Sequence, residues 1–495
     1  MSLKPLNQTE NYARKEACAQ DSTVVECRFS QGSEIAEILA VHPTVALTQC
    51  EMASGRINYG GRLICTVVYV DEEGKLCRMQ KGAEFSRFAD DELFASDKIA
   101  QCTLKCAKTN IKRDGSAFVI SSVITAQIVV YGTTKREYLC EIEGAITNPA
   151  TVKFTSAVAF SGESETEDDF EVDGVDDVLL PHADAIICEC VASSGEIKIS
   201  GEICLSMLAM RGETPVSLDR VIPFRSSLVC DRAQLNANAC ANVQIKDLSL
   251  NATVNEDRGK CYVEVSCQLL FNGVFFEENE TSIIADAFST TNELKCSKES
   301  EDTYACTGIK TFSQRISAPV TTSAKIDYTC SFKAVACPRI EYEYDDKRDL
   351  LQGALYTILI YEQNGELRSC SVELPFSESI KLGEQSGENY VSVAVCGISV
   401  RQQTEGGCVA EAVLKISACG VEKTVVEYVN TVVEGDEIAQ NDSAITVFIA
   451  DANEGLWQVA KRLKKHPTQV MGENPDLKFP TTGDERILIY RPKAY

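Results

Sequence analysis

The side chains that usually exchange protons or bind metals are unevenly supplied in this chain. It has only three histidines, His42, His182 and His466, but 23 cysteines among its 495 residues. Histidine is the side chain best suited to proton transfer near neutral pH, and closely spaced Cys and His side chains bind zinc. His42 and His466 each precede a proline, and all three histidines fall at expected element boundaries. The sequence therefore favours structural or solvent-exposed roles for them.

Two cysteine pairs have spacings that could hold a metal. Cys102 and Cys106 form a C-x3-C pair, and Cys188 and Cys190 form a C-x-C pair, both in strand-like sequence. Even spacing on a strand puts both side chains on one face. However, no C-x2-C pair and no downstream histidine accompanies them, so we predict no metal and no cofactor. No P-loop, Rossmann fingerprint or serine elbow occurs, and carboxylate clusters fall in expected turns and linkers. We therefore predict no catalytic residues and a protein that is not an enzyme.

Most other cysteines stand where a small apolar side chain would also serve. Cys65, Cys204, Cys267 and Cys396 are examples within strand-like segments. Free cysteine behaves as a small hydrophobe in protein cores. The sequence favours buried, reduced cysteines, and oxidative cross-linking in an assembly is the alternative.

Composition excludes several broad classes of protein. Asp and Glu number 73 against 48 Lys and Arg, which gives a formal net charge of −25. Such a balance argues against nucleic acid as the main partner, because phosphate binding needs clustered positive charge. No apolar run approaches the length that spans a bilayer, and the first twenty or so residues lack the apolar core of a secretory signal. We expect a cytosolic protein.

Comparison of the chain with itself reveals three repeats. Each runs from a glycine through an apolar strand, a polar turn and a second strand to a phenylalanine: Gly61–Phe85, Gly201–Phe224 and Gly353–Phe376. A second apolar segment follows each and ends at Gly132, Gly273 or Gly420. In 262–271 the apolar residues alternate with polar ones, which is typical of a half-buried strand. We predict three tandem antiparallel β-sandwich or barrel-like repeats.

Segments between the repeats differ in composition. Residues 161–177 are rich in Asp and Glu and lack basic residues, which predicts a solvated, extended linker. Near the N-terminus, Ser33 is a plausible N-cap for a short helix with Ile35, Ile38 and Leu39 on one face. The predicted boundaries are an N-terminal segment (1–40), repeat 1 (41–158), an acidic linker (159–178), repeat 2 (179–295), a linker (296–315), repeat 3 (316–435) and a C-terminal module (443–493).

The C-terminal module differs from the repeats in charge and in period. The segment 445–450 is typical of a strand, and Asn453 is a plausible N-cap for a following helix. Pro467 suits the first turn of a second short helix, and 485–492 reads as a closing strand. We predict a small α+β fold with the order strand, helix, helix, strand. The apolar stripe of its first helix comprises Leu456, Val459, Ala460 and Leu463.

This module resembles a LysM domain, whose first helix usually opens with Gly-Asp-Thr-Leu-Trp. The chain keeps Leu456 and Trp457, its only tryptophan, and the Val459–Ala460 pair. It also keeps an Asn474–Pro475 pair after the second helix, but the three residues before Leu456 are Asn453, Glu454 and Gly455.

The three repeats resemble SPOCS domains, the β-rich modules of spore-forming Firmicutes. The match is the strand–turn–strand pattern that closes in Pro-Phe in the second and third copies, whereas the first closes in Glu-Phe. Several SPOCS domains before one LysM domain are typical of the clostridial spore-coat morphogenetic proteins. The resemblance implies a non-enzymatic scaffold in the mother-cell cytoplasm, at the forespore surface, that helps to encase the forespore in coat.

In that family the LysM domain is thought to bind the coat-basement ATPase, stage IV sporulation protein A. We therefore expect a partner-binding surface on the exposed side of the first helix, with its basic flank, and on the loop after the second helix. The alternatives are a peptidoglycan- or N-acetylglucosamine-binding protein of the spore cortex or envelope, an enzyme with a LysM targeting tag, or a spore-surface appendage protein. The predicted partner-binding residues are Asn453, Glu454, Gly455, Trp457, Lys461, Arg462, Lys464, Lys465, Asn474 and Pro475.

Overall fold

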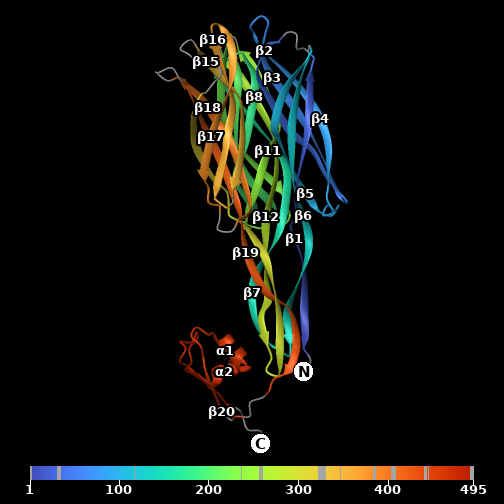
Figure 1. Ribbon diagram of the computed structural model, residues 1–495, viewed down its shortest axis with the longest axis vertical. Coiled ribbons are helices and arrows are strands. Elements are labelled where there is room, and N and C mark those ends of the chain that lie inside the picture. Colours follow the sequence, from blue (N-terminus) through green and yellow to red (C-terminus); the bar gives the residue numbers. More distant parts are fainter. Residues whose placement is uncertain are drawn as a thin grey trace.

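The computed structural model shows a mainly β protein with several antiparallel sheets and two short helices near its C-terminal end (Figure 1). It describes residues 3–30, 35–115, 117–235, 237–255, 260–320, 330–345, 347–382, 386–402, 408–439, 443 and 445–490. None of the helices in these ranges is both long and apolar enough to cross a membrane.

The strands form three units with the same order of elements. In each unit three consecutive strands make an antiparallel sheet, here called the meander sheet. The last and longest strand of the unit pairs with the strand before it and also with the first strand of the unit. These strands form a second sheet, here called the ribbon sheet. This order of pairing occurs three times along the described chain.

Unit 1 has the meander sheet β2-β3-β4 and the ribbon sheet β1-β6-β5. Its strands are β1 (Lys4–Phe29), β2 (Ile35–Ala53), β3 (Arg56–Asp71), β4 (Leu76–Asp90), β5 (Ile99–Asp114) and β6 (Ala117–Glu143).

Unit 2 has the meander strands β8-β9-β10 and the ribbon strands β11-β12-β7, joined into one sheet by a short β8–β11 pairing. Its strands are β7 (Ile146–Asp173), β8 (Asp177–Ser193), β9 (Glu196–Arg211), β10 (Thr214–Val229), β11 (Ala237–Asn255) and β12 (Lys260–Phe288).

In unit 3 the first strand is divided into two pieces, which both pair with the long β19. The break falls at residues 307–309, where Gly308 has a φ of 85°. The strands are β13 (Asn292–Cys306), β14 (Lys310–Pro319), β15 (Ser331–Asp345), β16 (Leu350–Gln363), β17 (Glu366–Ser379), β18 (Ser386–Gln402) and β19 (Cys408–Glu437).

The glycine and phenylalanine that delimit each sequence repeat are cross-strand partners in the meander sheets. Gly61 pairs with Phe85, and Gly201 with Phe224. Gly353 pairs with Phe376 in the same way. A Cβ on Gly201 would lie 2.1 Å from the carbonyl oxygen of Ile186 and 2.5 Å from the ring of Phe224. The glycine is therefore needed because the phenylalanine ring lies over its backbone, which fixes the register of the hairpin.

Each unit has its own apolar core between its two sheets, and a further core joins the units. The alternation predicted in β12 is confirmed, because Val263, Cys267, Leu269 and Phe271 are all fully buried in the core of unit 2. Where the three meander sheets meet, side chains from all three units pack together; they include Leu39, Leu179, Leu208, Ala334 and Ile360.

The long strands of the ribbon sheets continue beyond the meander sheets and form the narrow lower part of the molecule in Figure 1, here called the stalk. It comprises residues 4–15, 131–143, 146–159, 274–288, 292–306 and 421–437, paired as three two-stranded ribbons. Its core includes Leu139, Ile284 and Val429, one from each unit.

Arg136 is the one charged residue in the described chain that is almost completely buried in the stalk. Its guanidinium donates two hydrogen bonds to the carboxylate of Glu301 in unit 3, at 2.5 and 2.6 Å. The same group lies 4.0 Å from the ring centroid of Tyr12 in unit 1 and 3.9 Å from that of Phe154 in unit 2. One cation therefore contacts all three units.

The segments predicted as linkers are strands. Residues 161–173 form the second half of β7 and pair with β12 throughout, and residues 296–315 fall in β13 and β14. The acidic residues of β7 alternate, so that Glu163, Glu165 and Glu167 lie on the solvent face. Because β7 is the last strand in its sheet, this row of charge also protects an open sheet edge. In the sequence, the run of acidic residues hid the two-residue alternation that is typical of a strand.

The N-terminal prediction also needs correction. Residues 1–40 are not a separate segment, because β1 is a strand of unit 1 and pairs with β6 over most of its length. Residues 35–40 belong to β2 instead of a helix, and the proposed cap Ser33 lies outside the described residues. Pairing with β3 outweighed the local helical spacing of Ile35, Ile38 and Leu39.

Replacing Gly61 by alanine should destabilise unit 1, because the new Cβ would lie 2.7 Å from the carbonyl oxygen of Ala46 and 2.8 Å from the ring of Phe85. Overpacking of this kind costs about 1–3 kcal/mol. Urea unfolding measures the change. Gly82→Ala is the matched control in the neighbouring strand, where the nearest atom is the flexible side chain of Arg62 at 3.3 Å. Equal stability of the two variants would contradict the prediction.

Candidate partner-binding site

The C-terminal module has the predicted order of elements. Strand β20 (Ile445–Ile449) is followed by α1 (Leu456–Leu463), α2 (Pro467–Glu473) and β21 (Arg486–Tyr490), and the two strands pair antiparallel. Val459, Ala460, Val470 and Ile487 are fully buried between the helices and the sheet. Pro467 occupies the first turn of α2, as predicted.

The N-cap of helix α1 lies two residues later than predicted. Asn453 has a φ of 66° and lies outside the helix, whereas Gly455 is the N-cap. The backbone N–H of Gly455 donates to the side-chain oxygen of Gln458 at 2.5 Å. Asn453 is exposed and its backbone N–H donates to the carbonyl of Thr481. It therefore shapes the loop before α1.

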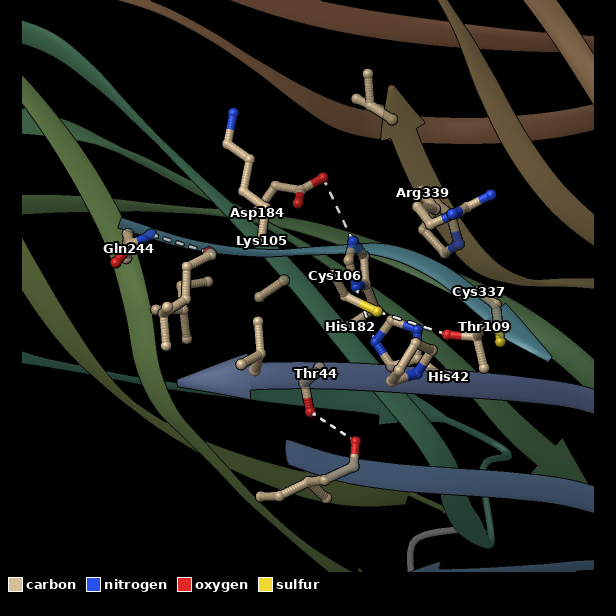
Figure 2. A pocket seen from close by; sticks show the side chains of 18 of the residues that line it. His42, Thr44, Lys105, Cys106, Thr109, His182, Asp184, Gln244, Cys337 and Arg339 are labelled. Carbon is tan, nitrogen blue, oxygen red and sulfur yellow. Dashed lines mark hydrogen bonds and ion pairs between the residues drawn. The ribbon is translucent and has the colours of Figure 1, made fainter. Parts of the chain in front are cut away.

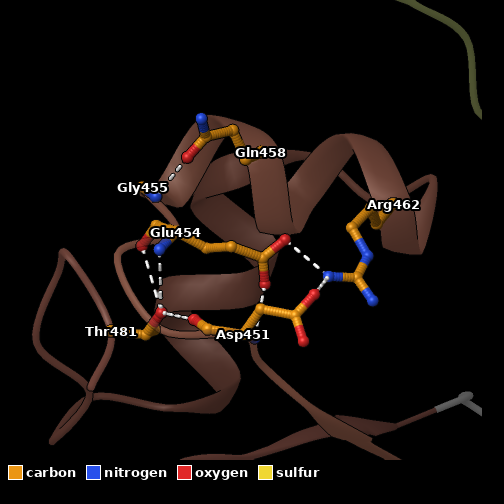
Figure 3. A network of polar contacts seen from close by, with 6 residues as sticks. All are labelled: Asp451, Glu454, Gly455, Gln458, Arg462 and Thr481. Carbon is orange, nitrogen blue, oxygen red and sulfur yellow. Dashed lines mark hydrogen bonds and ion pairs between the residues drawn. The ribbon is translucent and has the colours of Figure 1, made fainter. Parts of the chain in front are cut away.

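Arg462 is held by carboxylates of its own module. Its guanidinium lies 2.5 Å from Asp451 and 2.6 Å from Glu454, and it covers the ring of Phe448 at 4.7 Å from the centroid. Thr481 donates to the carbonyl of Asp451 at 2.6 Å and accepts from the N–H of Glu454 (Figure 3). This network fastens the loop before α1 to the loop before β21. Two of the predicted partner-binding side chains, Glu454 and Arg462, thus have structural contacts.

Asn474 also has a structural position. Its side-chain N–H groups donate to the carbonyls of Val470 and Leu488, and its oxygen accepts from the N–H of Leu488. It joins the end of α2 to β21. The next residue, Pro475, is exposed.

The tryptophan and one lysine of α1, and the lysine at its C-cap, contact the stalk instead of facing away from it. The indole N–H of Trp457 donates to Asp286 at 2.9 Å, and the ammonium group of Lys461 lies 2.6 Å from the same carboxylate. The ring of Trp457 packs edge-on against Phe288, with 5.1 Å between centroids. Lys464 pairs with Glu293 at 2.8 Å. The expected docking flank is therefore the face by which the module contacts its own stalk.

Asp286 is the centre of this contact. Its burial opposes ionisation, but the hydrogen bonds from Lys461 and Trp457 and the lysine charge outweigh the burial, so its pKa lies below the ordinary value. The carboxylate is therefore charged at neutral pH, and the contact is lost only when strong acid protonates it. Lys465 alone of the four basic residues in this flank has no ion pair within the described chain.

A surface that the sequence reasoning missed lies on the open side of the two-stranded sheet. Ile445, Val447 and Ile449 are 54%, 56% and 62% exposed. Their cross-strand partners on β21 include Tyr490, which is 44% exposed, and the half-buried Leu488. We call these five residues the apolar sheet face. The signal was present in the sequence, because β20 is apolar at nearly every position, whereas a strand with one solvated face alternates.

A second candidate region is a cavity of about 1830 Å³ between the three units, lined by strands of all three. Figure 2 shows His42, His182 and Cys337 close together in its wall. The Nε2 atom of His42 lies 3.1 Å from Nδ1 of His182, whose Nε2 lies 3.4 Å from Asp184. Both histidines lie within strands, β2 and β8, and not at element boundaries as we predicted. His466 does lie at a boundary, where its ring accepts from the N–H of Thr468 as the cap of α2.

The cysteines are mostly where the sequence placed them. Cys65, Cys204 and Cys267 are buried and unpaired, but Cys240 of β11 and Cys419 of β19 form a disulfide between units 2 and 3. Cys188 and Cys190 do not share a face, because a bulge in β8 turns Cys188 away from the core that contains Cys190. Across the described residues, no three His, Cys, Asp or Glu side chains are grouped as metal ligands.

Comparison with known proteins adds no identification: no family model, no curated protein and no solved structure matches the chain.

Replacing Asp286 by alanine should release the module from the stalk. The indole N–H and the lysine would lose a charged acceptor, and hydrogen bonds to charged groups contribute about 1.5–3 kcal/mol each. Since Trp457 is the only tryptophan, its fluorescence should shift to longer wavelength as the ring becomes hydrated. Glu278→Ala is the control, because Glu278 lies on the same strand and forms its ion pair with the exposed Lys153. An unchanged spectrum for the Asp286 variant would contradict this contact.

Stability should fall in mild acid because of His42. Burial, and secondarily the neighbouring His182, lower the pKa of His42 to about 3, whereas an unfolded histidine titrates near pH 6.5. The unfolded chain therefore binds the extra proton first, so the stability present above about pH 6.5 declines as the pH falls toward the folded pKa, by roughly 1 kcal/mol per pH unit.

Urea unfolding as a function of pH measures this slope. His42→Gln cannot take up the proton and keeps a polar group against His182, so its slope below about pH 6.5 should be shallower. Measurements near pH 8 control for any loss of packing. The same slope in both proteins would show that His42 does not contribute.

Proposed function

We propose that the chain is a non-enzymatic scaffold of spore-coat assembly whose C-terminal module binds the coat-basement ATPase, stage IV sporulation protein A. In this proposal it acts in the mother-cell cytoplasm at the forespore surface and helps to encase the forespore in coat. Three units of one design followed by a strand–helix–helix–strand module support it. This order is the one expected from the resemblance to SPOCS domains followed by a LysM domain.

The observation that carries the binding role is the apolar sheet face. Aliphatic side chains on a small, well-packed module are usually covered, and contiguous exposed apolar residues mark surfaces for partners. Here Ile445, Val447 and Ile449 lie on one side of β20, while the other side of the sheet packs on the helices. A protein partner would bury this surface, whereas a glycan would need polar groups around it.

The structure changes which residues we assign to the partner. Trp457, Lys461 and Lys464 already contact the stalk, and Glu454, Arg462 and Asn474 hold the module together. We therefore place the ATPase on the apolar sheet face. The remaining predicted contacts, Asn453, Gly455, Lys465 and Pro475, stay candidates for its edge.

The test is a binding assay between the full chain and the purified ATPase, run beside sedimentation with spore peptidoglycan. Val447→Glu should reduce binding to the ATPase by at least about tenfold, because burying an unpaired carboxylate in an apolar contact costs more than 1.4 kcal/mol. The side chain of the neighbouring Thr446 points toward the module, so Thr446→Glu would test folding instead of binding. The matched surface control is therefore Gln458→Glu, on the exposed part of α1.

Unchanged ATPase binding by Val447→Glu would exclude the apolar sheet face as the contact. Sedimentation with peptidoglycan in the absence of ATPase binding would instead favour the glycan-binding alternative.

A further inference from the structure

Three cysteines gather where unit 2 packs against unit 3. Cys188 of β8, Cys204 of β9 and Cys396 of β18 lie in one small cluster with Ile186 and Ala394. Cys204 is buried, whereas Cys188 and Cys396 are partly exposed. The cluster thus contains one buried cysteine beside two partly exposed ones.

Bulges direct two of these thiols into the seam between the units. In β18, Val395 pairs with Leu414 and Gly397 with Val413, so Cys396 is the extra residue. Cys188 is the extra residue of β8 in the same way. A bulge turns its side chain out of the regular alternation. The corresponding bulges in units 1 and 2 carry Ala107 and Lys246, so the cysteine is particular to unit 3.

Polar contacts keep the two sides of this seam in register. Lys415 of β19 forms an ion pair with Glu202, two residues from Cys204. The hydroxyl of Ser417 donates to the carbonyl of Ile187 at 2.5 Å, and the N–H of Val395 donates to Asp184 at 3.2 Å. The strands that carry Cys204 and Cys396 are therefore held together independently of the sulfur atoms.

The two sulfur atoms are electrostatically unequal. A hydrogen bond from Cys204 lowers the pKa of Cys396, and the charge of Lys415 adds to this against the effect of burial. The pKa of Cys204 is raised, first because it is the donor in that bond and then by its burial. Cys396 is also the partly exposed member of the pair and Cys204 the buried one, so a peroxide reaches Cys396 first. We therefore assign Cys396 as the nucleophile and Cys204 as the thiol that follows.

We propose that Cys396 and Cys204 form an oxidation site that reacts with hydroperoxides and closes a disulfide between unit 2 and unit 3.

Two steps complete the reaction. The sulfur of Cys396 attacks one oxygen of the peroxide, the O–O bond breaks, and the departing hydroxide takes the proton of Cys396 to become water, which leaves a sulfenic acid. The sulfur of Cys204 then attacks the sulfur of Cys396, the S–O bond breaks, and the leaving hydroxide takes the proton of Cys204. Two thiols are oxidised to one disulfide, and one hydrogen peroxide is reduced to two waters.

The new bond would join β9 to β18, in addition to the disulfide between Cys240 of β11 and Cys419 of β19. Both cross the same seam. Oxidation would therefore tie units 2 and 3 together at two points and restrict their separation on unfolding.

The experiment oxidises the full chain with hydrogen peroxide after reduction and removal of the reductant, alkylates the remaining thiols in acid-quenched samples, and maps disulfides in tryptic peptides. Cys204 and Cys396 fall in separate peptides, 199–211 and 382–401, each with no other cysteine. We expect these two peptides to be linked. The link should be absent in Cys396→Ser and should persist in Cys188→Ser.

A second variant tests the order of the steps. Cys204→Ser should stop at the sulfenic acid on Cys396, which dimedone traps as an adduct on peptide 382–401. Oxidation in denaturing urea is the control for random pairing and should abolish the preference for this link. Linkage of Cys396 to Cys188, or alkylation of both Cys204 and Cys396 in the oxidised native protein, would overturn the proposal.

Discussion

The arrangement of the three units depends on the burial of one guanidinium in the stalk. Arg136 contacts aromatic rings of units 1 and 2 and the carboxylate of Glu301 in unit 3. A buried charge without its partner is strongly destabilising, so this contact favours the arrangement of the three ribbons in which the guanidinium meets all of its partners. The seam between units 2 and 3 and the surface that receives the C-terminal module are both defined with respect to that position.

Three units of one design meet along seams whose side chains differ. The seam between units 1 and 2 places His42 against His182, whereas the seam between units 2 and 3 carries the cysteines. Equivalent bulges hold Ala107, Lys246 and Cys396 in the three units. The triplicated backbone therefore supplies similar positions, and single side chains decide what each can do.

The C-terminal module shows how far a site can be predicted from local pattern. The order of its elements and the buried stripe of α1 followed from apolar spacing. The role of its basic flank did not, because charge on a helix face does not specify which acidic surface it meets. Asp286 and Glu293, which accept Lys461 and Lys464, are more than 170 residues away in the chain. The apolar sheet face was visible as an unbroken apolar run in β20, but only the packed module showed which side remains open.

The sequence by itself determined the hairpin strands of the three repeats and the glycine and phenylalanine at their ends, because these depend on residue spacing along a strand and across one hairpin. It misassigned 159–178 and 296–315 as linkers, since a run of charge can be the solvent face of a paired strand. Only the tertiary structure decided which surfaces became seams, which thiols met and which face of the module stayed exposed. Those outcomes depend on contacts between residues that are distant in sequence, and no local period encodes them.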